Sequence, residues 1–254
     1  MLNSETIFLG IDPTSGRNTF TYAALDKDLG LRTLADADLG NLMDYIRGFE
    51  QVVLAINAPS GINRGLVRQK MKREVGGSHK IRGADMRLAE FELRERGISV
   101  SGTPGNIGMC SGWVQSGFDL YQNLLQSGFR KYPQNDRSLQ VLETHPHACF
   151  TVMAGCLPLP KPSLEGKLQR QLLLHDHGVQ IRDPMDFFEE VTRYKMAQGI
   201  WPTELLYLPE QLDALVAGYS AWMAINKPDQ ISMVGDEREG MIFLPESSLK
   251  DKYS

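Results

Sequence analysis

The sequence predicts an α/β protein with a mixed sheet, which carries a β-hairpin at one edge and helices on both faces. Three observations support this prediction. Residues 6–11 form a nearly continuous apolar run, which is typical of a strand buried on both faces. A second apolar run, at residues 19–25, follows the turn-forming residues 13–16, so the two runs form a hairpin. The most strand-like run of the chain, residues 52–56, comes after a predicted helix.

Hydrophobic spacing and helix-capping signals place the remaining elements. Further strands are expected over 31–34, 139–143 and 241–244, and helices over 39–46, 84–96, 114–125, 163–175, from Asp183 and from Pro209. Neither an internal repeat nor a linker interrupts this pattern. Residues 1–254 are therefore predicted to form a single domain, with a basic insertion around 61–82.

Charge is distributed unevenly along the chain. The net charge is −4, yet residues 61–82 contain seven basic side chains against Glu74 alone. The basic segment 64–82, which begins at Arg64 and ends at Arg82, could bind the phosphates of a nucleic acid. It could equally be a solvated helix face and loop, because no nucleic-acid-binding motif accompanies it.

Composition excludes several classes of protein. The apolar and charged fractions, 42% and 23%, are those of an ordinary globular domain. No window of the sequence is long and apolar enough to span a membrane, and no signal peptide is recognised at the start. Three cysteines without a Cys-x-x-Cys pair suggest neither a disulfide framework nor a zinc ribbon. The protein is expected to be cytoplasmic.

Three acidic residues lie where an α/β sheet places ligands. Asp12 ends the first predicted strand, Glu143 ends a later one, and Asp213 lies on the last long helix, in line with small residues that let the helix approach the sheet. Carboxylates that converge at one edge of a sheet can hold Mg²⁺ or Mn²⁺ beside a phosphodiester. Each acid also has a local alternative, as a turn-former or as a favourable charge near a helix N-terminus.

The opening Leu9-Gly10-Ile11-Asp12-Pro13, followed by a hairpin, resembles that of the RNase H-like superfamily, which includes the Holliday-junction resolvases. More specifically, the chain resembles domain-of-unknown-function family 429, whose members are described as predicted nucleases of RNase H fold. The resemblance rests on five stretches, in order: Gly10-Ile11-Asp12; Ala55-Ile56-Asn57-Ala58-Pro59; Arg87 and Glu90 with Arg96-Gly97-Ile98; Glu143-Thr144-His145-Pro146-His147-Ala148; and Leu212-Asp213-Ala214-Leu215.

The resemblance implies an RNase H-like fold and a catalytic site in which Asp12, Glu143 and Asp213 bind the metal. It also reveals one departure, because members of the family usually have an aspartate where this chain has Asn57. An asparagine can offer its carbonyl oxygen to a metal, but it brings no negative charge and cannot act as a base. Asn57 is expected to lie beside the three acids as the fourth member of the site.

Five further residues are candidates for substrate binding: Arg87, Glu90, His145, Lys161 and Arg170. Lys161 and Arg170 fall where the family tends to have basic residues, which could bind phosphate or be ordinary surface charges. His145 could assist Glu143 or be structural. Arg87 and Glu90 lie three residues apart on a predicted helix and could simply pair with each other.

Three functions are consistent with these observations. The leading one is a metal-dependent nuclease or phosphodiesterase, a hydrolase of the RNase H-like superfamily that uses Mg²⁺ or Mn²⁺. The second is a catalytically degenerate relative that binds nucleic acid or a nucleotide without cutting it, because Asn57 replaces a ligand. The third is an actin-like ATP-binding protein, although no second glycine-rich phosphate loop is found. The substrate, whether DNA, RNA or a small phosphoester, and the oligomeric state stay open.

Overall fold

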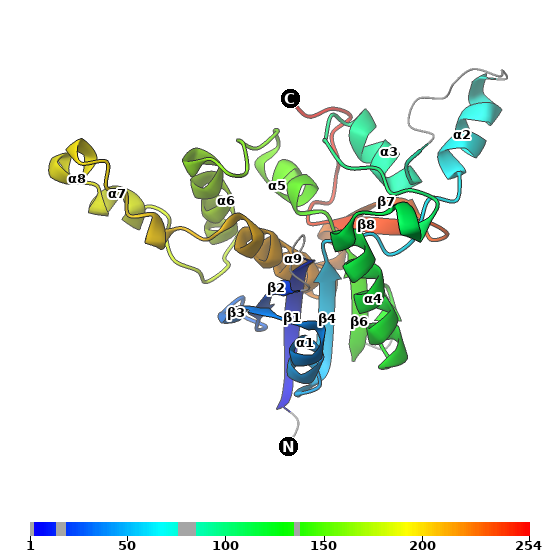
Figure 1. Ribbon diagram of the computed structural model, residues 1–254, viewed down its shortest axis with the longest axis horizontal. Helices are drawn as coiled ribbons and strands as arrows, with labels where there is room; N and C mark the ends of the chain where they lie inside the picture. The colour runs from blue at the N-terminus through cyan, green and yellow to red at the C-terminus, as the bar shows by residue number, and fades with distance from the viewer. Residues whose placement is uncertain (1–2, 14–18, 76–84, 135–137) are drawn as a thin grey trace.

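A computed structural model of the chain describes residues 3–13, 19–75, 85–134 and 138–254 and arranges them around one mixed sheet (Figure 1). The strand order is β3-β2-β1-β4-β6-β8-β7, and the short β5 pairs with β6 off this path. The strands are β1 (Asn3–Pro13), β2 (Phe20–Leu25), β3 (Leu31–Ala37), β4 (Phe49–Ile56), β5 (Arg130–Lys131), β6 (Leu139–Glu143), β7 (Ser232–Asp236) and β8 (Gly240–Leu244).

The centre of the sheet has the predicted arrangement. Strand β1 pairs with β2 as an antiparallel hairpin and with β4 in parallel, and β4 pairs with β6 in parallel. Ile11 lies opposite Ile56, and Ile56 lies opposite Glu143. Because β1, β4 and β6 run in the same direction and in register, their carboxyl ends meet at one edge of the sheet. The predicted α/β class and N-terminal hairpin are confirmed.

Helices cover both faces of the sheet, as predicted. On one face, α1 (Leu39–Ile46) and α4 (Gly112–Gln126) pack against the side chains of Leu9, Ile11 and Ile56. On the other face, α9 (Pro209–Asn226) and α5 (Pro146–Ala154) share a core with Phe8 and Ala55. Successive strand residues point to opposite faces, which is why the part of β1 from Ile7 to Ile11 is apolar on both faces.

Helix α9 lies unusually close to β1, and Gly10 is the reason. A Cβ atom on Gly10 would lie 1.9 Å from the carbonyl oxygen of Ala214 and 2.1 Å from the amide nitrogen of Gly218. No side chain fits there, so the helix backbone rests directly on the strand backbone. The small residues predicted to let α9 approach the sheet, among them Ala217, are fully buried at this contact.

The remaining helices lie around the end of the sheet where the three strands finish (Figure 1). They are α2 (Leu66–Val75), α3 (Leu88–Glu95), α6 (Leu164–Asp176), α7 (Asp186–Glu190) and α8 (Arg193–Ala197), with single 3₁₀ turns at Ile107–Met109, Thr203–Leu205 and Pro228–Gln230. Helix α2 forms the start of the basic segment, whose residues 76–82 lie outside the described part. Among the helices of the described residues, none has both the length and the apolar character that crossing a membrane requires.

Candidate functional site

Two carboxylates meet where β1 and β4 end. Asp12 follows the last core residue of β1, and Asp213 lies in the second turn of α9, which rests on that strand. The Asn57 amide, just after β4, donates a hydrogen bond from Nδ2 to Oδ1 of Asp12 at 2.5 Å. The Lys161 ammonium donates to Oδ2 of Asp213. These four residues, Asp12, Asn57, Lys161 and Asp213, are called the carboxylate site below.

The carboxylate site holds more negative charge than its surroundings favour. Burial, followed by the neighbouring Asp213, raises the pKa of Asp12 to about 7, against an ordinary value of 3.8, and the Asn57 hydrogen bond only partly opposes this. Burial also raises the pKa of Asp213, and the Lys161 ammonium opposes that shift. Two buried carboxyl groups that disfavour ionisation would be stabilised by an added cation.

Glu143 does not join these two acids, although the sequence predicted that it would. It lies opposite Ile56 in the sheet, so its side chain leaves on the face of Ile56 and Ile11, which α4 covers. Asp12 is one residue further along its own strand and leaves on the opposite face, where α9 lies. Parity along the strands therefore separates Glu143 from Asp12 and Asp213.

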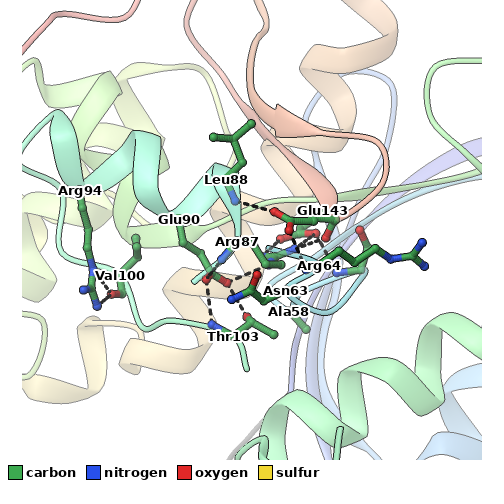
Figure 2. Close-up of polar contacts among 12 residues, drawn as sticks. Ala58, Asn63, Arg64, Arg87, Leu88, Glu90, Arg94, Val100, Thr103 and Glu143 are labelled. Carbon is green, nitrogen blue, oxygen red and sulfur yellow. Dashed lines mark hydrogen bonds and ion pairs between the residues drawn. The ribbon is translucent and has the colours of Figure 1, made fainter. Parts of the chain in front are cut away.

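Glu143 instead belongs to a buried group of ionised side chains at the same edge of the sheet (Figure 2). Arg87 donates from Nη1 and Nη2 to its two carboxylate oxygens, at 3.0 and 2.5 Å, and from Nε to Glu90 at 2.8 Å. The Arg87 side chain is 1% exposed. Although burial disfavours the charge, Glu143 and Glu90 hold the pKa of Arg87 above its ordinary value. The residues Arg87, Glu90, Glu143 and Glu239 are called the buried ionic network below.

Glu239 was not among the site residues predicted from the sequence, yet it connects three parts of the fold. Its Oε1 accepts hydrogen bonds from the backbone N–H groups of Arg64 and Leu66, at 2.6 and 3.1 Å, and its Oε2 accepts from Leu88 N–H at 2.8 Å. One carboxylate therefore caps the N-termini of both α2 and α3, where negative charge is favourable. Its sequence signal is the pair Glu239-Gly240 ahead of the last strand, which is similar to the ending of family 429.

The predicted substrate-binding residues lie in different environments. Arg87 and Glu90 pair with each other, as the spacing allowed, and both are almost fully buried. Arg170 is 2% exposed, and its Nη1 donates to the carbonyl oxygens of Leu159 and Gly166. Of the basic candidates, Lys161 has the accessible side chain, 43% exposed. Contact between any of these residues and a substrate stays a prediction.

His145 lies between the carboxylate site and the buried ionic network. Its Nδ1 accepts the N–H of Ala148 at 3.3 Å and so caps α5. Burial, then the nearby His147 and Arg87, lower the pKa of His145 to about 4, so the ring is neutral at pH 7. A neutral imidazole with a bonded Nδ1 carries its proton on Nε2, which makes it a hydrogen-bond donor.

The donor atoms at the carboxylate site suit a hard cation. Asp12 and Asp213 supply carboxylate oxygens and Asn57 a carbonyl oxygen, which are the ligand types that Mg²⁺ and Mn²⁺ prefer. Within the residues that the structure describes, no three His, Cys, Asp or Glu side chains lie close enough together to hold a metal ion. A cation held here would therefore rest on two carboxylates, an amide and water.

Helix α2 presents exposed basic side chains on the described part of the basic segment. Arg68 pairs with Asp85 at 3.1 Å and Lys70 with Glu92 at 3.6 Å, and both basic side chains are about half exposed. Surface pairs of this kind contribute little to stability. These charges are therefore available to a polyanion, while residues 76–82 with Lys80 and Arg82 lie outside the described residues.

Replacing Arg68 and Lys70 with alanine should weaken binding to nucleic acid and flatten its salt dependence. Each phosphate contact that is lost reduces the slope of log K against log salt by roughly 0.7–0.9, so the pair should reduce it by up to about two. Fluorescence anisotropy with labelled DNA and RNA between 50 and 200 mM salt measures this, with the α8 variant Arg193→Ala/Lys195→Ala as the control. Equal slopes in all three proteins would show that α2 is only solvated surface.

Comparison with models of known protein families identifies a match. The model of the family described as "Protein of unknown function (DUF429)" matches residues 10–239, which include the carboxylate site and the buried ionic network. No curated protein matches the chain. No solved structure matches it either.

Proposed function

We infer the function from the site itself, because the chain belongs to the DUF429 family, and that family is described as one of unknown function. We propose that the protein hydrolyses phosphodiesters with the help of Mg²⁺ or Mn²⁺, as a nuclease or phosphodiesterase of the RNase H-like type that the sequence resemblance implies. The reaction would take place at the carboxylate site.

One observation carries this proposal. Two buried carboxyl groups, Asp12 and Asp213, lie together at the carboxyl ends of parallel strands, and their pKa values are raised by burial and, for Asp12, by the other acid. Sites that bind divalent cations are built this way, because a cation relieves the repulsion. When bound, such a metal polarises a phosphate and lowers the pKa of an attacking water.

The residues of this chain then have separate roles. Asp12 and Asp213 hold the cation, and the Asn57 amide fixes the orientation of Asp12 through its hydrogen bond. Lys161 reaches Asp213 from the solvent side, so its ammonium can pass from the carboxylate to an incoming phosphate oxygen. Glu143 takes no part in this proposal, because its two oxygens are engaged by Arg87.

A second candidate function is binding of a phosphate-containing ligand without cleavage. Two points favour it. The sequence resemblance implies an acid where this chain has Asn57, and the Lys161 ammonium already neutralises part of the charge on Asp213. A site of this kind could hold its ligand through Lys161 without a metal. Among the described residues we find no feature that favours the actin-like alternative.

Hydrolysis and metal binding can be tested on the same set of proteins. In a thermal-shift titration, Mg²⁺ or Mn²⁺ should stabilise the wild type by about 2.7 kcal/mol at one hundred times its dissociation constant. Asp12→Asn and Asp213→Asn should lose most of this gain, and Asn57→Asp should bind the metal more tightly. Asp119→Asn, on the exposed face of α4, is the matched control.

Activity is measured with bis(p-nitrophenyl) phosphate and with single-stranded and duplex DNA and RNA. Asp12→Asn should lower the rate at least about 100-fold, since even outer-shell changes at metal sites cost 10–100-fold. Phosphate binding that depends on Lys161 without metal-dependent turnover would support the second candidate instead. If the wild type and Asp12→Asn respond equally to metal, the proposed cation site is wrong.

A further inference from the structure

A small cavity adjoins the carboxylate site and has no role in the proposed chemistry. Its volume is about 90 Å³, and its lining includes Asn57, Thr103, Trp113, Glu143 and His145. Asn57 is thus shared, because its amide contacts Asp12 while the residue also borders the cavity. By the same measure one water needs on the order of 10–15 Å³, so the space suits one six-membered ring with its substituents. This space is called the Trp113 cavity.

Charge in the wall of the Trp113 cavity excludes an anion. The wall contains Arg87 and the carboxyl groups of Glu90 and Glu143. The Arg87 guanidinium already donates four hydrogen bonds, two to Glu143, one to Glu90 and one to the carbonyl oxygen of Glu239. The network therefore has no positive charge to spare. A phosphate belongs near Lys161 instead, on the other side of Asn57.

One carboxylate in the wall can still accept a hydrogen bond from a ligand. Glu90 is saturated, because its two oxygens accept from Arg87 Nε and N–H and from the Thr103 hydroxyl and N–H. Within the described residues Glu143 accepts three bonds, and its Oε1 takes only that from Arg87 Nη2. A carboxylate has about four lone-pair sites, so Glu143 Oε1 can still accept an N–H from a ligand.

Aromatic and donor groups complete the Trp113 cavity. Trp113 lies in the first turn of α4, half-buried, and within the described residues its indole N–H donates to no protein acceptor. A flat ring gains from stacking on such an indole. The neutral His145 ring, a donor through Nε2, lines the same space and suits a carbonyl oxygen.

We propose that the Trp113 cavity binds an amino-substituted pyrimidine ring, the base of a cytidine nucleotide, whose phosphate lies at the carboxylate site. The exocyclic amino group would donate to Glu143, as acidic side chains accept from cytosine elsewhere, and the ring would stack on Trp113. A uracil ring would instead turn a carbonyl oxygen toward the Glu143 carboxylate. This proposal rests on the proposed function and assigns the substrate class to that site.

Equilibrium binding of cytidine, uridine, CMP, UMP and ribose 5-phosphate, measured by calorimetry, tests the assignment. Cytidine should bind about tenfold or more tightly than uridine, since one hydrogen bond to a charged group accounts for that ratio. Trp113→Ala should weaken the affinity for cytidine about tenfold and leave the affinity for ribose 5-phosphate unchanged. Trp113→Phe should retain most of the affinity, and Trp201→Ala, on the exposed loop after α8, is the control.

The outcomes separate the two proposals. Equal affinity for cytidine and uridine, or no cytidine binding, would overturn the assignment even if ribose 5-phosphate binds and is sensitive to Lys161→Met. Selective cytidine binding without any affinity for ribose 5-phosphate would support base binding in the Trp113 cavity, overturn the placement of the phosphate at the carboxylate site, and count against the phosphodiesterase. If Trp113→Ala fails to fold, quenching of Trp113 fluorescence by cytidine in the Trp201→Phe/Trp222→Phe variant decides, and no quenching overturns the proposal.

Discussion

Replacing Arg87 with methionine should lower the free energy of unfolding by about 3–5 kcal/mol, the usual cost of breaking a buried ion pair by removing one partner. Methionine retains much of the side-chain volume but leaves Glu143 and Glu90 buried without their cation. The loss also removes a hydrogen bond to the Glu239 carbonyl group. Urea denaturation followed by circular dichroism measures the change.

The matched control for this experiment is Arg68→Met, which removes an arginine from a pair that is 58% and 95% exposed. Such surface pairs are worth about 0–1 kcal/mol, so this variant should unfold close to the wild type. Glu143→Gln should lower the free energy of unfolding less than Arg87→Met does, because it removes a charge from a network that already has more carboxyl groups than cations. Equal denaturation midpoints for Arg87→Met and the wild type would show that the network contributes nothing to stability.

Stability of the metal-free protein should fall as the pH rises from about 4 to about 7, through Asp12. The folded protein binds the Asp12 proton up to about pH 7, whereas the unfolded chain releases it near pH 3.8. Over this range the folded state holds more protons, so raising the pH favours unfolding. At roughly 1.4 kcal/mol per pH unit, the free energy of unfolding of the wild type should fall by up to roughly 4 kcal/mol over this range, relative to that of Asp12→Asn.

The comparison must be made as a difference between two proteins, because His145 acts in the opposite direction. Its pKa is lowered to about 4 in the folded state, so its contribution to stability rises with pH between about 4 and 6.5. Asp12→Asn keeps His145, and the difference isolates the carboxyl group. Denaturation in EDTA at several pH values gives the two curves, and parallel curves would contradict the raised pKa of Asp12.

The core of the fold could be predicted because the local sequence and the tertiary structure agree there. The apolar run of β1 and that of β4 are each long enough to identify a buried strand, and they lie side by side as expected. The apolar stripe after Pro209 gave the start of α9, and small residues on that helix indicated its close contact with the sheet. Each of these signals lies within a single short window.

The site was predicted only in part, because its geometry depends on register between distant strands. Asp12, Asn57 and Asp213 lie together at the ends of β1 and β4, each at or beside an element whose sheet contact was predictable. The pairing of Lys161 with Asp213 was not predicted. Glu143 shows the limit of such reasoning. The position of an acid at a strand end does not reveal on which face it lies, and a shift of one residue reverses the face.

The contacts of Arg87 and Glu239 could not be predicted for a different reason. Arg87 bonds to Glu143, and Glu239 to Leu88, across more than fifty residues of sequence. Neither residue belongs to a helical or strand-like hydrophobic repeat that would have indicated the contact. Glu239 also acts through backbone N–H groups, which every residue except proline possesses and which therefore leave no mark in a sequence. Only the pairing of Arg87 with Glu90, three residues away, had a local signal.

The backbone contact between Gly10 and α9 has a consequence for how the protein can change. Because main-chain atoms of Ala214 and Gly218 occupy the space of any side chain at position 10, the spacing between β1 and α9 is set by peptide groups alone. Asp12 lies two residues after Gly10, and Asp213 lies directly before Ala214, so the same peptide groups fix how far apart the two carboxylates are. An alanine at position 10 would displace Asp213 while leaving every polar residue of the site intact. A relative that has lost Gly10 can thus retain all four site residues in its sequence and still lack the site.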